Sequence, residues 1–314
     1  MSLLKDRTVL VLLAAIPVLI VAGPVIPDWV RFFLQVSLAS GLAVLGVVVQ
    51  MRAGLVSFGQ GLYYCLGAYA AGMTGHFVGV TDAFALLGLG IVVAAGVAFV
   101  LGFLMSRYRE IFFAMLSLAL SMILYGLLVK AEALGSTDGF NLPKATFLGL
   151  APTQQALRLA VYALTCAVTL LAAIFLYRYL KSPMGSIGEA IAQNEIRVEY
   201  LGSSARAVVH TTYVLAAALS GAGGALAALA NGHVDPEMAN WTTSGQFVFV
   251  ALLSGTGSVA APLIGNFLLE MIRVYAVAWS PYTWQLILGA TMLLVILFLP
   301  GGLWSLVDRR KMGS

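Results

Sequence analysis

Three side chains of the kind that bind metals alternate in one polar loop. His233, Asp235 and Glu237 lie in the stretch NGHVDPEMANW, which runs from Asn231 to Trp241. Imidazole and carboxylate groups are common ligands of divalent metals, so this spacing is compatible with a metal site. A closed structural site takes four ligands, however, and no fourth candidate stands nearby in the sequence. An ordinary solvated loop is therefore the favoured interpretation, and we expect neither a metal nor a cofactor.

A carboxylate inside an apolar stretch is the second group that could do chemistry. Glu270 is the only acidic residue deep in such a band, and ionisable groups in membrane segments often serve the proton relays of carriers. Arg273 follows three residues later, a spacing that lets the two side chains pair on one helix face. A lone acid that already has a partner weakens the interpretation as a proton-coupled carrier.

Motifs for nucleotide hydrolysis and for nucleophilic catalysis are absent from the sequence. There is no G-x-x-x-x-G-K-[ST] phosphate loop, no C-x-x-C, no H-E-x-x-H and no G-x-S-x-G. The two cysteines, Cys65 and Cys166, lie inside apolar bands, so neither a disulfide framework nor a thiolate metal site is indicated. We therefore expect that the chain is not an enzyme.

The composition indicates that these groups are carried by membrane helices. The chain has 314 residues, of which 61% are hydrophobic and only 10% are charged, whereas soluble domains carry about 25% charged residues. The net charge of +4 is not gathered into a basic cluster with interleaved aromatic residues, so no nucleic-acid partner is expected. The composition predicts an all-α polytopic membrane protein that forms a single domain over residues 1–314.

Apolar runs predict eight transmembrane helices, most of them near the roughly 20 residues that a bilayer requires. The predicted spans cover residues 8–23, 32–49, 55–80, 83–105, 111–129, 157–179, 208–230 and 285–298. The stretch 247–278 is also apolar, but Gly255, Gly257, Pro262 and Gly265 interrupt it. Broken helices enter and leave a membrane on the same side, so we expect a re-entrant hairpin there.

The distribution of basic residues predicts the orientation of these spans. Cytoplasmic loops carry an excess of Lys and Arg. With both termini in the cytoplasm, twelve of the seventeen Lys and Arg residues fall on the inner side, including the basic run at 309–311. This topology places the polar insert between the sixth and seventh spans inside the cell.

That insert, residues 182–205, has the pattern of an amphipathic helix. Ile187, Ile191, Val198 and Leu201 fall on one face of a helix with 3.6 residues per turn. Such a helix can lie on a bilayer or dock into a groove of a soluble partner, and the same pattern also fits an ordinary solvated loop helix. Residues 186–200 contain three Glu and one Arg. Anionic lipid attracts cationic helices, so this charge favours a protein partner over the bilayer.

Seven sequence blocks in the same order resemble one transporter family. They are AGLVSFGQGLYYCLGAYA, REIFFAMLSLALSMILY, LGSTDGF, SPMGSIGEAIAQNEIRVEYLG, NGHVDPE, LLSGTGSVAAPLIG and LFLPGGLWSL. The chain resembles the permease subunits of the branched-chain amino-acid (LivM/LivH-type) ABC importers, and is most similar to the LivM-like member. The resemblance extends from about Arg52 to the C-terminus.

The resemblance implies a coupling helix that docks into a separate ATPase, together with a substrate pathway and an external loop. The implied assembly contains two ABC ATPase subunits, a second permease subunit, homologous or identical, and a periplasmic substrate-binding protein, in the bacterial inner membrane. The expected ATPase-coupling residues are Ile187, Glu189, Ala190, Ile191, Asn194, Glu195, Val198 and Gly202. The expected pathway residues are Ser57, Gln60, Tyr64, Gly67, Ser117 and Ser121. The expected external-loop residues are Thr137, Asp138 and Gly139.

Departures from the family pattern bear on the solute. Leu55 stands where the family commonly has Gln, and Ser117 stands for a family Thr. Fewer polar groups would face the pathway than in the family pattern. Amides, urea and organic or aromatic acids are therefore alternatives to amino acids as the transported solute. A self-contained carrier or channel is the alternative from another class, and a membrane scaffold is the third. Neither a carrier nor a scaffold requires a coupling helix.

Overall fold

The computed structural model describes residues 7–255 and 257–280, together with positions 283, 286, 289, 290, 293, 294, 297, 298 and 302. Its described part is all-α. The first helices are α1 (Arg7–Ala22), α2 (Asp28–Arg52), α3 (Gln60–Met73), α4 (Ala83–Met105) and α5 (Glu110–Lys130). They are followed by α6 (Gln154–Leu180), α7 (Pro183–Tyr200), α8 (Ala205–Asn231), α9 (Trp241–Ser254) and α10 (Ala260–Trp279). Two short strands, β1 (Phe140–Asn141) and β2 (His233–Val234), pair antiparallel.

Six of these helices are long and apolar enough to cross a membrane: α2, α4, α5, α6, α8 and α10. The predicted spans at 32–49, 83–105, 111–129, 157–179 and 208–230 therefore correspond to α2, α4, α5, α6 and α8. Helix α1 contains a shorter apolar stretch, Val9–Ala22. The predicted last span, 285–298, lies outside the described residues apart from isolated positions. The multi-pass, all-α class is thus confirmed.

Helix α3 is shorter than its predicted span of 55–80. The helix begins at Gln60 because the preceding segment is tied to α5: the backbone N–H of Phe58 donates to Ser117 Oγ at 3.0 Å. A Cβ on Gly59 would meet the Ser117 carbonyl oxygen at 2.8 Å, so this contact depends on glycine. At the other end of α3 a π-helical turn, Thr74–Val78, replaces the regular helix.

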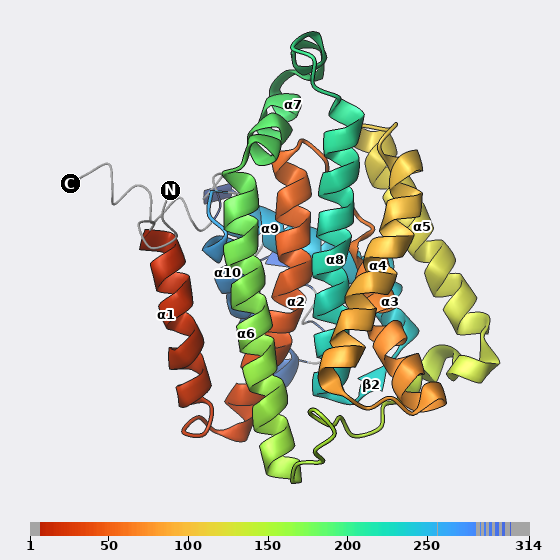
Figure 1. Cartoon of the computed structure of the whole chain (residues 1–314), viewed down its shortest axis with the longest axis vertical. Coiled ribbons are helices and arrows are strands. Elements are labelled where there is room, and N and C mark those ends of the chain that lie inside the picture. The colour runs from red at the N-terminus through yellow and green to blue at the C-terminus, as the bar shows by residue number, and fades with distance from the viewer. Residues whose placement is uncertain are drawn as a thin grey trace.

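Helix α8 forms the centre of the bundle, with α2 and α4 on either side of it (Figure 1). Three of its glycines, Gly221, Gly223 and Gly224, allow the close approach of its neighbours. A Cβ at these positions would collide with atoms of α4, α2 and α3 respectively. Small residues let helices in membranes approach until their backbones touch, and van der Waals packing then holds them together. The core of the protein is therefore a tightly packed junction of α2, α3 and α4 around α8.

Gly67 on α3 lies at this junction, and its substitution provides a test of the packing. A Cβ on Gly67 would overlap the carbonyl oxygen of Gly221. Gly67→Leu should therefore force α3 away from α8 and destabilise the fold by at least the roughly 1–3 kcal/mol that overpacking costs. The variant should still reach the membrane, because leucine favours the lipid phase. The measurement is the thermal stability of detergent-purified protein.

Gly126→Leu is the matched control, because a Cβ on Gly126 of α5 would meet no atom within 4 Å. We expect this variant to melt like the unmodified protein. Equal melting temperatures for Gly67→Leu and Gly126→Leu would show that close packing at Gly67 does not stabilise the bundle.

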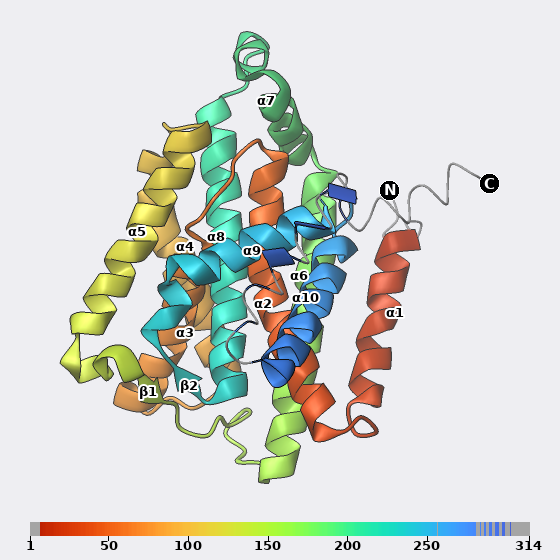
Figure 2. The same cartoon turned by 180° about the vertical axis from the view of Figure 1, so that it is seen from behind.

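Helix α5 stands at the edge of the bundle, in contrast to α8 (Figure 2). Large apolar side chains along its length are exposed; they include Ile111, Phe112, Met115, Ile123 and Leu127. Its buried residues are few: Phe113, Ser117, Ser121 and Leu128. The helix is thus held to the rest of the chain along one narrow stripe.

The apolar stretch 247–278 is divided between two helices. Helix α9 ends at Ser254, and Gly255 takes a left-handed φ of 81° before α10 begins at Ala260. At 1.5 Å per residue the 14 residues of α9 cover about 21 Å, less than the roughly 30 Å of a bilayer core. Figure 2 shows α9 crossing the bundle obliquely and α10 turning back beside α2. There, Asn266 Nδ2 on α10 donates to the carbonyl oxygen of Ser37 at 2.6 Å.

Candidate functional site

The insert between α6 and α8 stands away from the bundle at one end of the molecule (Figure 1). Its helix, α7, starts where the sequence supplies start signals: Ser182 is the N-cap residue, and its Oγ accepts the N–H of Gly185 at 3.5 Å. Pro183 occupies the first helical position, where its missing N–H leaves no bond unmade.

Helix α7 is not continuous, which corrects the expectation of a single amphipathic helix. Asn194 has φ −161° and ψ 98°, so two helices meet at an angle there. Its side chain accepts the N–H of Arg197 at 3.0 Å and so caps the second, shorter helix. The break changes the phase of the residues that follow it. Val198 is buried, whereas Leu201 is 80% exposed, so the two do not share a face.

The inward face of the insert packs against the chain itself. Ile191 and Val198 are each 6% exposed and form a cluster with Ala205 and Val208 at the start of α8. Ile187 and Ala190 are partly buried against the same cluster. Ile187, Ile191 and Val198 thus pack wholly or partly against the start of α8, and their expected role in docking to a partner stays a prediction.

The outward tip of the insert carries apolar side chains that touch little else. Ile196, Tyr200 and Leu201 are 67%, 88% and 80% exposed respectively. Gly202 follows with a left-handed φ of 85° and turns the chain back toward α8. We refer to Ile196, Tyr200 and Leu201 as the apolar tip. Exposed apolar groups that project beyond the bundle are typical of a protein contact.

Two ion pairs connect the insert to the membrane helices. Glu195 accepts two hydrogen bonds from Arg109, from Nε at 2.9 Å and from Nη2 at 2.8 Å. Glu189 pairs with Arg52 at 3.3 Å. Arg109 immediately precedes α5, and Arg52 is the last residue of α2. The bidentate geometry at Arg109 fixes both the direction and the distance of the contact, so the insert is tied to α5 as well as to α6 and α8.

The six expected pathway residues are all buried inside the helix bundle. Ser57 adjoins Phe58, whose backbone N–H donates to Ser117 Oγ at 3.0 Å, and Ser121 Oγ donates to the Ala239 carbonyl oxygen at 2.7 Å. Tyr64 packs edge-on against Phe247 of α9, with ring centroids 5.3 Å apart. Ser57, Gln60, Tyr64, Ser117 and Ser121 are each at most 7% exposed. Their role in a pathway therefore stays a prediction.

Gln60 is the centre of a buried polar network that joins α2, α3 and α8. Its Nε2 donates to Gln50 Oε1 at 2.9 Å, and its Oε1 accepts from Ser220 Oγ at 2.6 Å. All three residues are fully buried. Gln50 Nε2 has no hydrogen-bond partner among the described residues. A buried polar network in which one group lacks a hydrogen-bond partner destabilises the fold. Here that group, the Gln50 amide, lies where α2, α3 and α8 meet.

The external-loop residues expected from the sequence form a compact turn at the end opposite α7. Thr137 and Asp138 belong to the 3-10 turn Ser136–Asp138, and Gly139 has φ 65°. A Cβ on Gly139 would overlap the Val234 carbonyl oxygen, so glycine permits the approach that pairs β1 with β2. The loop after α5 is thereby fastened to the loop after α8.

His233 and Glu237, considered above as metal ligands, make contacts within these loops. His233 Nδ1 lies 3.0 Å from Asn141 Oδ1. Glu237 accepts from Tyr125 at 3.0 Å and from Asn240 at 2.8 Å. Glu270 and Arg273 pair at 3.5 Å on α10, as their spacing predicted.

Comparison with known families identifies the group to which this architecture belongs. The family model described as "Branched-chain amino acid transport system / permease component" matches residues 30–296. The chain belongs to this family. The matched range runs from the start of α2 beyond the end of α10 and includes the whole α7 insert.

Individual relatives agree with the family match. The chain is 28% identical over 281 residues to the high-affinity branched-chain amino acid transport system permease protein LivM of Escherichia coli (strain K12). That alignment covers 82% of this chain and 65% of the relative. The LivM protein of Salmonella typhimurium is 29% identical with the same coverage. The corresponding LivH protein is 25% identical over 87% of this chain and 94% of the relative. No solved structure matches the chain significantly.

Sequence reasoning missed several residues of this permease-family site. Gln50 lies just beyond the predicted span 32–49, and it accepts a hydrogen bond from Gln60 of the next helix. Arg52 and Arg109 entered only the charge count, and their partners on the insert are 137 and 86 residues away. In the sequence, the two pairs are indicated only by basic residues at the ends of two spans and acidic residues on one insert. These features do not determine which basic residue pairs with which acidic residue.

Proposed function

We propose that this chain is the transmembrane permease subunit of an ATP-driven ABC importer for branched-chain amino acids or related small polar solutes. The observation that carries the proposal is the α7 insert. It projects from one end of the bundle, exposes the apolar tip, and is ion-paired to the ends of two membrane helices. A self-contained carrier needs no such element.

In this proposal the insert receives the motion of two ABC ATPase subunits. The remaining partners are a second permease subunit, homologous or identical to this chain, and a periplasmic substrate-binding protein. LivM and LivH proteins both match the chain, which supports a related pair of permeases. The assembly lies in a bacterial inner membrane, and ATP is hydrolysed by the partner subunits.

The pathway residues belong to the same proposal. Because they are buried within one bundle, a solute can pass them only when helices separate. Helix α5 is the element suited to move, since it is held along one narrow stripe and is tied to the insert through Arg109. ATP-driven displacement of α7 would then pull α5 away from α3 and open a route past Ser57 and Ser117.

Reconstitution into proteoliposomes tests the proposed function. Uptake of labelled leucine should require the permease pair, the ATPases, ATP and the loaded binding protein together. Omitting the ATPases should remove uptake completely if the chain is an importer subunit. A carrier would behave differently, because the chain alone would move solute down its gradient. Leucine movement through this chain alone would overturn the proposal.

The proposed topology has eight spans and a re-entrant hairpin formed by α9 and α10, with both termini and α7 in the cytoplasm. In support, α7 and the β1–β2 ribbon lie at opposite ends of the molecule (Figure 2). The break at Gly255 between α9 and α10 supports the hairpin, although α10 alone is long enough to cross a membrane.

Cysteine labelling tests this topology. Gln193 on α7 and Ala133 in the loop after α5 are both exposed, whereas the native Cys65 and Cys166 are buried and provide a quiet background. In intact cells, Gln193→Cys should react only with membrane-permeant reagents, and Ala133→Cys should also react with impermeant ones. Labelling of both positions from the same side would contradict the topology.

A further inference from the structure

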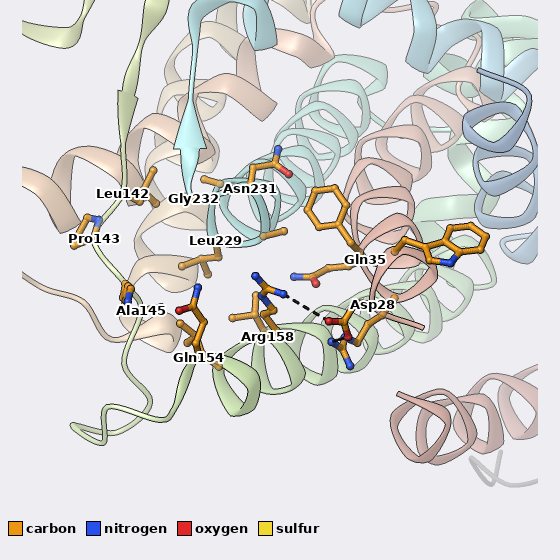
Figure 3. Close-up of a pocket in the computed structure, with 18 residues that line it drawn as sticks. Asp28, Gln35, Leu142, Pro143, Ala145, Gln154, Arg158, Leu229, Asn231 and Gly232 are labelled. Carbon is orange, nitrogen blue, oxygen red and sulfur yellow. Dashed lines mark hydrogen bonds and ion pairs between the residues drawn. The ribbon is translucent and has the colours of Figure 1, made fainter. Parts of the chain in front are cut away.

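A cavity of about 530 Å³ lies at the end of the bundle opposite α7 and is separate from the coupling insert (Figure 3). Its walls are the first turns of α2 and α6, the last turn of α8 and the loop around residues 142–145. Neither the insert nor the proposed pathway residues line it. The coupling and pathway assignments therefore leave this cavity unexplained.

The cavity is positively charged. Arg31, Lys144 and Arg158 line it, and Asp28 is the single carboxylate among its lining residues. One oxygen of Asp28 pairs with Arg31 and the other lies 3.7 Å from Arg158, so both oxygens are already engaged. Lys144 is exposed and makes no hydrogen bond or ion pair with the rest of the described chain. The described lining residues of the cavity therefore carry a net positive charge that suits an anionic ligand.

An unpartnered amide points into the same space. Gln35 on α2 is 5% exposed and lines the cavity, yet its side chain makes no hydrogen bond with any described residue. Figure 3 shows the amide directed toward Arg158. A buried amide normally has hydrogen-bond partners, because a buried donor or acceptor that lacks one costs free energy of folding. The Gln35 N–H groups are therefore available to a ligand that accepts hydrogen bonds.

The remaining walls are apolar and reach the outer surface of the bundle. Phe32, Val161 and Leu229 line the cavity, and Trp29 at its rim is 68% exposed. Tryptophan is enriched at the level of lipid head groups, where one side of the ring is apolar and the other is wet. A ligand that fits this site has an anionic, hydrogen-bond-accepting group and an apolar portion beside it.

We propose that this cavity binds the phosphate of an anionic phospholipid head group, with the acyl chains lying against the exposed side chains of Trp29 and Phe32 at the start of α2. Lys144 and Arg158 contact the phosphate oxygens, and the Gln35 amide donates to one of them. Free phosphate shares the anionic chemistry but has no portion that uses the apolar wall.

Lipid titration of the purified protein in nanodiscs tests this site. Phosphatidylglycerol should raise the melting temperature relative to phosphatidylcholine alone. Lys144→Gln should weaken the apparent affinity for phosphatidylglycerol about fivefold, and Lys144→Gln with Arg158→Gln about 25-fold, the effect expected of one and two cationic contacts. Lys144 is exposed and without a partner in the described chain, so its substitution does not threaten the fold. Lys130→Gln, an exposed cation outside the cavity, should leave the affinity unchanged.

Gln35→Leu separates binding from structure. Removing an unpartnered amide should leave the lipid-free melting temperature equal or higher, while the shift caused by phosphatidylglycerol should shrink. Equal lipid shifts in the unmodified protein and the Lys144→Gln, Arg158→Gln double variant would overturn the proposal. It would also be overturned if inorganic phosphate or leucine, rather than the lipid, produced the shift that these substitutions remove.

Discussion

Replacing Leu201 with Asp should separate the permease from its ATPases while leaving the permease folded. Leu201 is 80% exposed at the apolar tip, so the substitution disturbs little within the chain. If the tip is buried in a groove of the ATPase, the introduced carboxylate loses its water without gaining a partner. That loss costs roughly 3 kcal/mol or more, which corresponds to at least a 100-fold weaker association. The measurement is co-purification of the ATPase subunits with tagged permease.

Two substitutions on the same insert serve as controls. Ile191→Asp introduces the same charge into the chain's own cluster with Val198 and Ala205, so it should lower the melting temperature of the isolated permease. Ser204→Asp adds a charge at an exposed N-cap position, where aspartate is also a good cap, and should change neither stability nor association. Undiminished ATPase co-purification with Leu201→Asp would exclude the apolar tip as the docking surface.

The contrast between Leu201 and Ile191 shows what the sequence could and could not predict about the insert. Its position, its N-terminal start at Ser182 and its amphipathic character follow from local residue types, which act over a few positions. The docking face does not, because the 3.6-residue phase holds only while the helix continues. After the non-helical residue Asn194, Val198 still packs with Ile191, whereas Leu201, expected on the same face, is exposed. Asparagine is a preferred N-cap residue, but a single Asn in an otherwise helical pattern does not predict a break; its backbone angles and its capping bond to Arg197 show it here.

The positions of the membrane helices also follow from local residue types. Long apolar runs must form helices because lipid offers no partner to backbone N–H and C=O groups, so five predicted spans correspond closely to α2, α4, α5, α6 and α8. Polar residues within these runs carry less information. Gln50 and Gln60 are ten residues apart, and whether they meet depends on how α2, α3 and α8 pack. Packing of this kind is a property of the whole bundle and leaves no local pattern.

Breaking the Arg109–Glu195 pair should uncouple transport from ATP hydrolysis. Within the described residues, this bidentate pair joins the insert to the start of α5, a helix with few other buried contacts. Glu195→Arg leaves two cations adjacent, so α7 should move with the ATPases without carrying α5 along. Leucine uptake per ATP hydrolysed should fall about tenfold, within the 5–150-fold range typical of coupling between sites. The measurement is uptake and hydrolysis in the same proteoliposomes, and hydrolysis itself should persist.

The charge-exchanged variant, Arg109→Glu with Glu195→Arg, tests whether the pair acts as a unit. It should recover part of the lost uptake, because opposite charges again face each other. Recovery should be incomplete, since Arg109 also donates to the carbonyl oxygens of Ser106 and Tyr108 at 2.7 and 2.9 Å, and a carboxylate cannot replace those bonds. Arg107→Glu is the matched control, because Arg107 is an exposed arginine of the same loop that makes no ion pair within the described chain. In this variant the ratio of leucine uptake to ATP hydrolysis should be unchanged. If Glu195→Arg kept the unmodified ratio of uptake to hydrolysis, α5 would not be driven through this pair, and the motion of α7 would have to reach the membrane through α6, α8 and the Glu189–Arg52 contact with α2.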